Sequence, residues 1–202
     1  MSKARLLVVG AGGHGRSVAE AAQLSGLFTV VGFLDDSMPA GEMALGIPVL
    51  GSVASFAKHQ NVCDQAIVAI GNNSVRDKLM QQLAEAGISL TTVAHPRAFV
   101  SPSALVGHGT AIMAGAIVGT EARLGVGAIV NCGAVVDHHA TVEDYGHLGV
   151  NASMAGGTVL GRGAWMQAGS ALGYGVRVAP GETVWPGEGR TLMSHHESLE
   201  VT

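Results

Sequence analysis

Residues 100–130 read VSPSALVGHGTAIMAGAIVGTEARLGVGAIV, and every sixth residue of this stretch is aliphatic. The pattern continues through fifteen consecutive steps, at Val100, Val106, Ile112, Val118, Leu124, Val130, Val136, Val142, Leu148, Met154, Leu160, Met166, Leu172, Val178 and Val184. A small residue follows four positions after most of these, at Ala104, Thr110, Ala116, Ala122, Ala128, Ala134, Ala140, Gly146, Ala152, Thr158, Ala164 and Ser170. A period of six fits neither an α-helix nor an isolated strand, but it is a known β-helix repeat. We therefore expect short strands and corners stacked into a solenoid, with each large residue pointing inward beside a small one.

The composition excludes several classes of protein. The chain has 202 residues, of which 48% are hydrophobic and 13% charged, and its net charge is −4. Glycine, alanine and polar residues interrupt the apolar ones, so no segment is typical of a membrane span. Lysine and arginine form no clusters, which argues against a nucleic-acid surface. Residues 1–9 lead directly into a glycine loop and are expected to be a first strand, not a signal peptide, so a cytoplasmic protein is predicted.

The first part of the chain alternates between strand and helix patterns. Strands are expected over residues 6–9, 30–34, 65–70 and 89–93, with helices over 16–25 and from Asn73 or Ser74 to Gly87. Val75, Leu79 and Leu83 recur every fourth residue and should form the buried face of the second helix. Such alternation predicts a small parallel sheet covered by helices. The predicted domains are therefore residues 1–95, a β-helix over 96–189 and a tail over 190–202.

A glycine-rich loop follows the first predicted strand. Residues 10–15 read GAGGHG, and Asp35 follows Gly15 by twenty residues at the end of the next strand. Glycines allow the backbone to approach a diphosphate, and a helix start offers free N–H groups. The domain lacks the second half of a dinucleotide fold, so a nucleotide diphosphate is favoured over a dinucleotide, with a tight turn that binds nothing as the alternative. Gly71 closes the third strand at the same edge of the sheet, where α/β folds bind ligands.

Three of the nine histidines fall within ten residues of the repeat: His138, His139 and His147. They avoid the first and fifth positions of their hexapeptides, which predicts that they face outward, toward solvent or a neighbouring subunit. A histidine titrates near neutral pH and can accept a proton from a nucleophile. A metal site is the rival interpretation, but no cysteine or regularly placed carboxylate completes it. No metal is therefore expected.

Together these motifs match a known family. GAGGHG at 10–15, LDD at 34–36, GNN at 71–73 and the segment NCGAVVDHHATVEDYGHLGVNASMAGG at 131–157 resemble bacterial left-handed β-helix sugar acetyltransferases of the PglD/NeuD type. The resemblance covers about residues 1–185. It implies a Rossmann-like α/β domain of small parallel sheet followed by a left-handed parallel β-helix of hexapeptide repeats.

The resemblance also implies an activity and an assembly. Family members use acetyl-CoA to N-acetylate nucleotide-linked 4-amino sugars or to O-acetylate sialic acids in glycan biosynthesis, as homotrimers that bind acetyl-CoA between adjacent solenoids. By motif position, His138 is the general base, His147, Gly156 and Ala168 contact acetyl-CoA, and a further set holds the nucleotide-activated amino sugar. That set is Gly12, Gly13, His14, Asp35, Asp36 and Gly71.

One departure from the family pattern concerns the general base. Family members have a carboxylate directly after the base, whereas this chain has His139. Asp137, on the other side of His138, is expected to take over part of the missing role. Two alternatives to N-acetylation stay open. One is O-acetylation of sialic acid or of a polysaccharide sugar, which needs a base equally. The other is non-catalytic binding of a nucleotide sugar, which the missing carboxylate makes possible.

Overall fold

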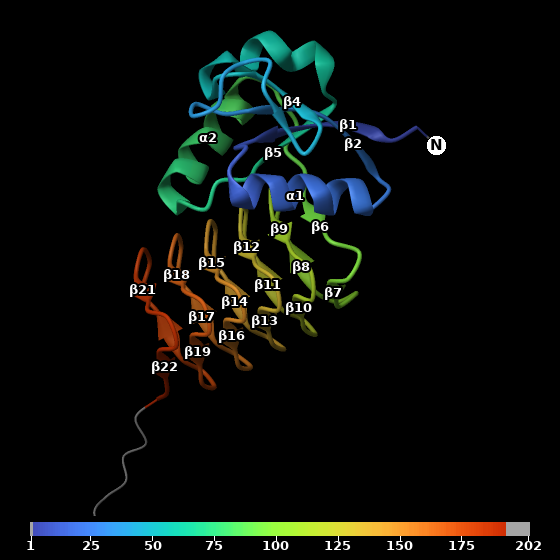
Figure 1. Cartoon of the computed structure of the whole chain (residues 1–202). Helices are drawn as coiled ribbons and strands as arrows, with labels where there is room; N and C mark the ends of the chain where they lie inside the picture. Colours follow the sequence, from blue (N-terminus) through green and yellow to red (C-terminus); the bar gives the residue numbers. More distant parts are fainter. Residues whose placement is uncertain (1, 193–202) are drawn as a thin grey trace, which may run out of the picture.

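The computed structural model describes residues 2–192 and shows a small α/β domain seated on one side of a solenoid (Figure 1). The α/β domain forms a sheet of strand order β3-β4-β2-β1-β5, in which β3 alone is antiparallel to its neighbour. Its elements are β1 (Ala4–Val9), α1 (Gly13–Leu24), β2 (Phe28–Leu34), β3 (Met43–Ala44), β4 (Ile47–Gly51), the 3-10 helix η1 (Val53–Val62), β5 (Gln65–Val68) and α2 (Asn73–Glu85).

The second helix differs from the sequence-based prediction. Its N-cap is Asn72, whose side-chain oxygen accepts a hydrogen bond from the backbone N–H of Val75 at 3.1 Å. The buried face is shifted by one residue, because Arg76 and Met80 are buried while Val75 is 41% exposed. The prediction assumed that the buried face is apolar, and Arg76 breaks that assumption.

The solenoid is a parallel β-helix of two-residue strands. They are β6 (Val93–Ala94), β7 (Phe99–Val100), β8 (Leu105–Val106), β9 (Ala111–Ile112), β10 (Ile117–Val118), β11 (Arg123–Leu124), β12 (Ile129–Val130), β13 (Val135–Val136), β14 (Thr141–Val142), β15 (His147–Leu148), β16 (Ser153–Met154), β17 (Val159–Leu160), β18 (Trp165–Met166), β19 (Ala171–Leu172), β20 (Arg177–Val178), β21 (Thr183–Val184) and β22 (Gly189–Arg190). Every third strand joins the same sheet, so residues 18 apart in sequence are stacked on one another.

Three sheets enclose the core of the β-helix. We call them the docking sheet (β6, β9, β12, β15, β18, β21), the β7 sheet (β7, β10, β13, β16, β19, β22) and the β8 sheet (β8, β11, β14, β17, β20). From Ile112 to Val184 the residues at the first positions of the hexapeptides form one continuous interior cluster with most of the small fifth-position residues, as predicted. Val106, in the first coil, is 37% exposed. A single coil cannot bury its own apolar residues and depends on the coils above and below it. The repeat must therefore be continuous.

Two predicted boundaries shift. The strand expected over 89–93 is wrong, since Leu90 forms only an isolated bridge to Ala66, and β6 pairs with β9 of the solenoid. The tail expected from residue 190 starts later, because Arg190 lies in β22. Residues 193–202 of that predicted tail lie outside the described residues.

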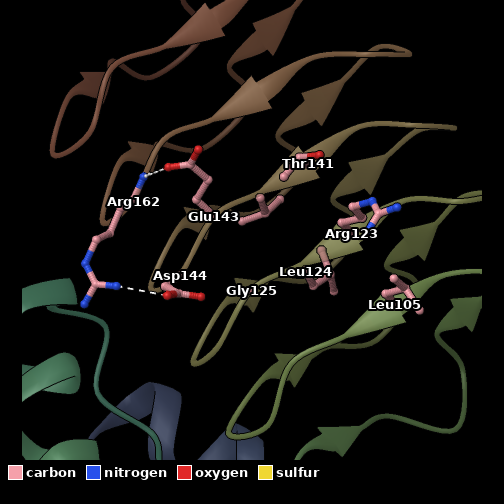
Figure 2. A pocket seen from close by; sticks show the side chains of 9 residues that line it. Leu105, Arg123, Leu124, Gly125, Thr141, Glu143, Asp144 and Arg162 are labelled. Atoms are coloured by element: carbon pink, nitrogen blue, oxygen red, sulfur yellow. Dashed lines mark hydrogen bonds and ion pairs between the residues drawn. The ribbon is translucent and has the colours of Figure 1, made fainter.

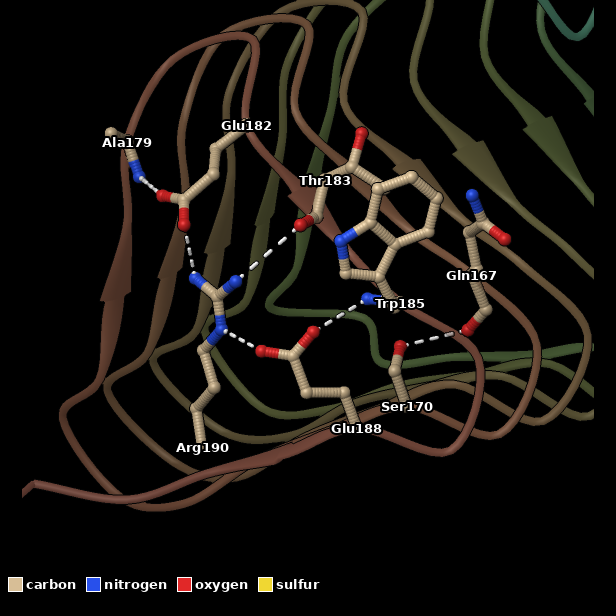
Figure 3. Close-up of polar contacts among 8 residues, drawn as sticks. All are labelled: Gln167, Ser170, Ala179, Glu182, Thr183, Trp185, Glu188 and Arg190. Carbon is tan, nitrogen blue, oxygen red and sulfur yellow. Dashed lines mark hydrogen bonds and ion pairs between the residues drawn. The ribbon is translucent and has the colours of Figure 1, made fainter.

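Charged side chains close the last coil of the β-helix (Figure 3). The Arg190 guanidinium donates to the carboxylates of Glu182 and Glu188. These carboxylates also accept the backbone N–H groups of Ala179, at 3.0 Å, and Trp185, at 2.7 Å. Within residues 2–192 no later coil pairs with these two backbone N–H groups, and the two carboxylates accept them instead.

The α/β domain packs on the docking sheet. Outward-facing Val93, Ala111 and Ile129 of that sheet belong to the same apolar cluster as Val18 and Ala22 of α1. Because this surface is apolar on both sides, the domain is fixed to the β-helix rather than tethered by a linker alone.

Arg76 of α2 fastens the two parts at a second point. Its fully buried guanidinium donates to the backbone carbonyls of Gly127 at 2.7 Å and Tyr145 at 2.8 Å in the β-helix, and of Ile70 at 2.9 Å in its own domain. Burial lowers the pKa of Arg76 to about 10. The side chain remains charged at neutral pH and ties the loop after β5 to the corners of the solenoid.

Candidate functional site

A cavity of about 450 Å³ opens at the carboxyl edge of the α/β sheet. It is lined by all six residues that the family resemblance assigns to a nucleotide sugar, namely Gly12, Gly13, His14, Asp35, Asp36 and Gly71. These residues follow β1, β2 and β5, and α1 begins at the cavity with its free N–H groups. Parallel sheets bind ligands at this edge, and a helix start favours an anion such as a diphosphate.

The glycines of the loop have different roles. A Cβ at Gly12 or Gly13 would meet no atom within 4 Å, so these two positions leave open space. A Cβ at Gly15 would lie 1.9 Å from the carbonyl oxygen of Gly10, so this glycine is needed for the close contact of helix and loop. Gly12 and Gly13 thus line the cavity at positions where an added Cβ collides with nothing.

The two aspartates hold the shape of the cavity. Asp35 accepts hydrogen bonds from the backbone N–H of Ala11 at 2.7 Å and of Ser37 at 2.8 Å, and from the Ser37 hydroxyl. Burial alone would raise the pKa of Asp35, but these hydrogen bonds outweigh it and hold the pKa below its usual value. One oxygen of Asp36 accepts the N–H of Val53 at 2.8 Å. Asp35 thus ties the glycine loop to the end of β2.

His147 does not face solvent, and in this respect the sequence-based prediction is wrong. It points out of the solenoid from the docking sheet, but the α/β domain covers it and leaves it 7% exposed. Its Nδ1 lies 3.2 Å from the carbonyl oxygen of Gly71, and its ring stacks on Trp165 with centroids 5.4 Å apart. The Gly71 carbonyl can only accept, so Nδ1 carries the proton of the neutral ring.

His14 lies beside His147 under the same cover, with ring centroids 6.5 Å apart. The Nε2 atoms of both rings are buried without a hydrogen-bond partner among the described residues. Burial, and secondarily the charge of Arg76, lowers the pKa of His14 to about 4 and that of His147 to about 3. Both rings are therefore neutral at physiological pH.

His138 and His139 lie at the corner between the β7 sheet and the β8 sheet. His138 is about half exposed, with its Nδ1 3.0 Å from Nδ1 of His139 and its Nε2 3.2 Å from the Tyr174 hydroxyl. Asp137 accepts the backbone N–H of His138 at 2.7 Å, and its other oxygen is 3.8 Å from Nε2. Both imidazole nitrogens of His138 thus have a polar neighbour within the chain, His139 at Nδ1 and Tyr174 at Nε2.

The structure separates the residues expected to contact acetyl-CoA. Gly156 lies directly under His138, since a Cβ there would be 2.4 Å from the His138 ring. Ala168 lies between β18 and β19, at the corner between the docking sheet and the β7 sheet. His147 is on the docking sheet itself. Within one chain, Gly156 alone of the three adjoins His138.

Sequence reasoning missed three residues beside the site histidines: Arg76, Tyr174, and Glu121, whose carboxylate lies 3.1 Å from Nε2 of His139. The signal for two of them is the 18-residue stacking period. Tyr174 is 36 residues after His138, and Glu121 is 18 residues before His139. Each pair therefore shares one corner of the β-helix. Arg76 gives no such signal, because charged residues on a helix are usually solvated.

A second cavity, of about 400 Å³, lies on the outer face of the β8 sheet (Figure 2). Arg162 borders it and donates to Asp144 at 3.0 Å and, beyond the cavity, to Asp77 of α2 at 2.7 Å. Exposed Leu105 and buried Leu124 contribute apolar surface on the same face.

No helix among residues 2–192 has the length and apolar character needed to cross a membrane. Nor does any group of His, Cys, Asp or Glu side chains in this range have the arrangement of a metal site.

Comparisons with known proteins place the chain. The family model of the PglD N-terminal domain matches residues 5–83. The chain is 34% identical over 108 residues to UDP-N-acetylbacillosamine N-acetyltransferase of Bacillus subtilis, a match that covers 53% of the chain and 50% of that protein. The chain thus spans about half the length of this curated relative.

Two solved structures resemble the chain over nearly its full length. The acetyltransferase domain of PglB from Neisseria gonorrhoeae, in complex with acetyl coenzyme A, has a TM-score of 0.87 and 32% identity, with 94% of both chains covered. PerB from Caulobacter crescentus, in complex with CoA and GDP-perosamine, has a TM-score of 0.82 and 33% identity, with 93% of this chain and 92% of that chain covered. With its matching fold and glycine-loop cavity, the chain belongs to the PglD/NeuD-type family of left-handed β-helix sugar acetyltransferases.

Proposed function

We propose that the protein transfers the acetyl group of acetyl-CoA to the amino group of a nucleotide-linked 4-amino sugar. The cavity at the start of α1 carries this proposal, because its glycines and helix N-terminus suit a diphosphate, which free sialic acid lacks. The relatives support it: PglB was solved with acetyl coenzyme A and PerB with CoA and GDP-perosamine. Asp36, with one oxygen not held by Val53, is available to a hydroxyl of the nucleotide.

In the proposed reaction His138 is the general base. The sugar amine attacks the thioester carbonyl, His138 Nε2 accepts the proton released from nitrogen, and the C–S bond breaks as the tetrahedral intermediate collapses. His138 then passes this proton to the CoA thiolate. Because the amine attacks the thioester directly, no acyl-enzyme is needed. His147, Gly156 and Ala168 are proposed contacts of acetyl-CoA, with Asp137 and His139 flanking the base.

The fold of one chain separates the two halves of this site. The nucleotide cavity borders His147 on the docking sheet, through Gly71. His138 is at the corner between the other two sheets, which is the vertex of the triangular coil opposite the docking sheet. We therefore propose that a neighbouring subunit supplies the cavity that faces His138, in a homotrimer. The closed assembly would also cover exposed Leu105 of the β8 sheet.

Light scattering at micromolar concentration tests the assembly, with three chain masses as the expected result. Mixing two inactive variants gives a second measurement. Subunits of His138→Ala keep the cavity, and subunits of Gly13→Leu keep the base. A mixed trimer can therefore pair an intact cavity with an intact base and should recover activity. A monomer, or mixtures that remain inactive although mass spectrometry shows mixed trimers, would contradict a site shared between subunits.

Turnover of acetyl-CoA tests the activity itself. Release of CoA thiol should require a UDP-, GDP- or dTDP-linked 4-amino sugar, and mass spectrometry should show one acetyl group on the product nitrogen. Sialic acid and a polysaccharide unit serve as competing acceptors. Acetylation of a hydroxyl in either, with no transfer to any amino sugar, would replace N-acetylation by O-acetylation.

Gly13→Leu is expected to weaken nucleotide-sugar binding selectively. The added side chain extends into open space that borders the cavity, where a diphosphate would lie. We expect the KM for the nucleotide sugar to rise by roughly 10-fold or more, equivalent to about 1.4 kcal/mol. The melting temperature should not fall, because leucine favours a helix more than glycine does.

Gly15→Ala is the matched control for this substitution. Its Cβ would collide with the Gly10 carbonyl, so it should lower the melting temperature. If Gly13→Leu instead left the KM for the nucleotide sugar unchanged, the diphosphate would lie elsewhere. If the wild type bound a nicotinamide dinucleotide tightly, a dinucleotide site would replace ours.

A further inference from the structure

A carboxylate stands behind His139, in the preceding coil of the β-helix. Oε2 of Glu121 lies 3.1 Å from Nε2 of His139. Nδ1 of His139 lies 3.0 Å from Nδ1 of His138. The three side chains thus form a continuous chain of contacts, Glu121–His139–His138, that ends at the nitrogen facing Tyr174.

The chemistry of the carboxylate fixes the direction of these hydrogen bonds. An ionised Glu121 can only accept, so Nε2 of His139 must carry a proton. In neutral His139 the other nitrogen, Nδ1, is then an acceptor. Nδ1 of His138 must accordingly donate to it, which leaves Nε2 of neutral His138 with a free lone pair. One distant carboxylate thereby selects the His138 tautomer that can act as a base.

The backbone at both positions has the corner geometry of this β-helix. Glu121 and His139 have left-handed backbones, with φ of 56° and 58°. Glycine occupies the same corner position in the next two coils, as Gly157 with φ of 66° and Gly175 with φ of 68°. At the other corners a side chain is also combined with a left-handed backbone at Tyr145 and Asn151. The corner therefore accepts Glu121 and His139, and their role lies in their side-chain contacts.

We propose that Glu121, acting through His139, is a positioning residue that holds His138 with Nε2 unprotonated and ready to accept the proton of the amine. The proposal rests on the proposed role of His138 as general base. It also explains how the chain compensates for the missing carboxylate beside His138. That carboxylate is supplied one coil earlier, with His139 as the connector.

Other polar groups around the two histidines do not provide the same function. Asp137 accepts the backbone N–H of His138, and its second oxygen is 3.8 Å from Nε2, on the side of the ring that must stay free. Tyr174 meets the same Nε2 and can donate its hydroxyl proton to the lone pair. Arg123 shares a small cavity with Glu121 and His139 and is the nearby cation. None of these three contacts His138 Nδ1.

Nuclear magnetic resonance tests the tautomer without any need for turnover. Long-range ¹H–¹⁵N spectra of the imidazole rings show which nitrogen carries the proton. At neutral pH the wild type should show His138 protonated at Nδ1 and His139 at Nε2. Glu121→Gln should produce a mixture of His138 tautomers, whereas Glu85→Gln, at an exposed position ending α2, should leave the spectrum unchanged. A wild-type His138 protonated at Nε2 would overturn the proposal.

Kinetics give the second readout. Glu121→Gln should lower kcat by about 10-fold, with little change in the KM of either substrate. In a buried serine-protease triad, a wrong histidine tautomer lowers kcat by ~10⁴-fold. The effect expected here is smaller because Glu121 is exposed to solvent. Loss of Glu121 with no change in kcat would contradict the proposal.

Substituting His139 by glutamate, the kind of residue the family has at this position, distinguishes a positioning role of Glu121 from a purely structural one. His139→Glu places a carboxylate directly beside His138, at a backbone conformation that Glu121 itself adopts one coil earlier. In that background Glu121→Gln should no longer reduce kcat, a coupling that a double-mutant cycle measures. An equal loss in both backgrounds would show that Glu121 acts through the fold. His138→Ala could retain turnover while Glu121→Gln still changes the His138 tautomer. In that case His138 is not the general base, but Glu121 does set the tautomer of His138 through His139.

Discussion

His138→Ala should lower kcat by roughly 10²–10⁴-fold, the usual contribution of a positioned general base. His138 is half exposed at a corner, and its ring makes no contribution to the core of the solenoid. The fold should therefore survive the substitution, and the KM values for both substrates should change little. Steady-state kinetics with thiol detection, together with the melting temperature, measure these quantities.

His108→Ala is the control for the loss of an outward histidine from the solenoid. His108 is exposed at the corner between the β8 sheet and the docking sheet, and its backbone carbonyl accepts the N–H of Gly127 at 2.9 Å. It should retain wild-type turnover. Near wild-type turnover in His138→Ala would mean that the base lies elsewhere, or that the amine arrives already deprotonated.

The repeat could be predicted from sequence because every hexapeptide needs a large apolar residue at the same inward position. Fifteen inward positions demand a large apolar residue, so errors at any one coil do not hide the period. The α/β domain has no such redundancy. The strands β3 and β4 and the 3-10 helix η1 were not predicted, because elements of two to five residues and an irregular helix leave little periodicity in the sequence.

The cavity at the edge of the α/β sheet was also predictable, because its residues follow strand ends and the parallel topology gathers strand ends at one edge. The environment of His147 was not. Its position in the hexapeptide shows only that it points out of the solenoid, and whether solvent or a domain covers it depends on where the α/β domain docks. Arg76 was missed for a similar reason, since the acceptors of its guanidinium in the β-helix are carbonyls 51 and 69 residues away.

The docking of the two parts should make the protein unusually sensitive to mild acid. His14 and His147 have pKa values lowered to about 4 and about 3, below the ordinary value of 6.5. As the pH falls below 6.5 the unfolded chain therefore takes up two protons that the folded chain does not. The free energy of unfolding should fall by as much as about 1.4 kcal/mol per pH unit for each proton.

The window from pH 6.5 to 5 isolates this effect. Above it both histidines are neutral in either state and their contribution to stability is fully present. Below about pH 4.5 carboxylates with lowered pKa values, such as Asp35 and Glu182, begin to add their own losses. Denaturant unfolding at fixed protein concentration should thus show a slope approaching two protons between pH 6 and 5.

His147→Gln tests the assignment of the slope to the interface between the domains. Glutamine retains a donor for the Gly71 carbonyl but does not titrate, so one proton should disappear from the pH dependence, even if the variant is less stable at pH 7. His108→Gln removes an exposed histidine instead and should leave the slope unchanged. An unchanged slope in His147→Gln would mean that the folded protein admits the proton at this site, which requires the α/β domain to lift from the docking sheet before the β-helix unfolds.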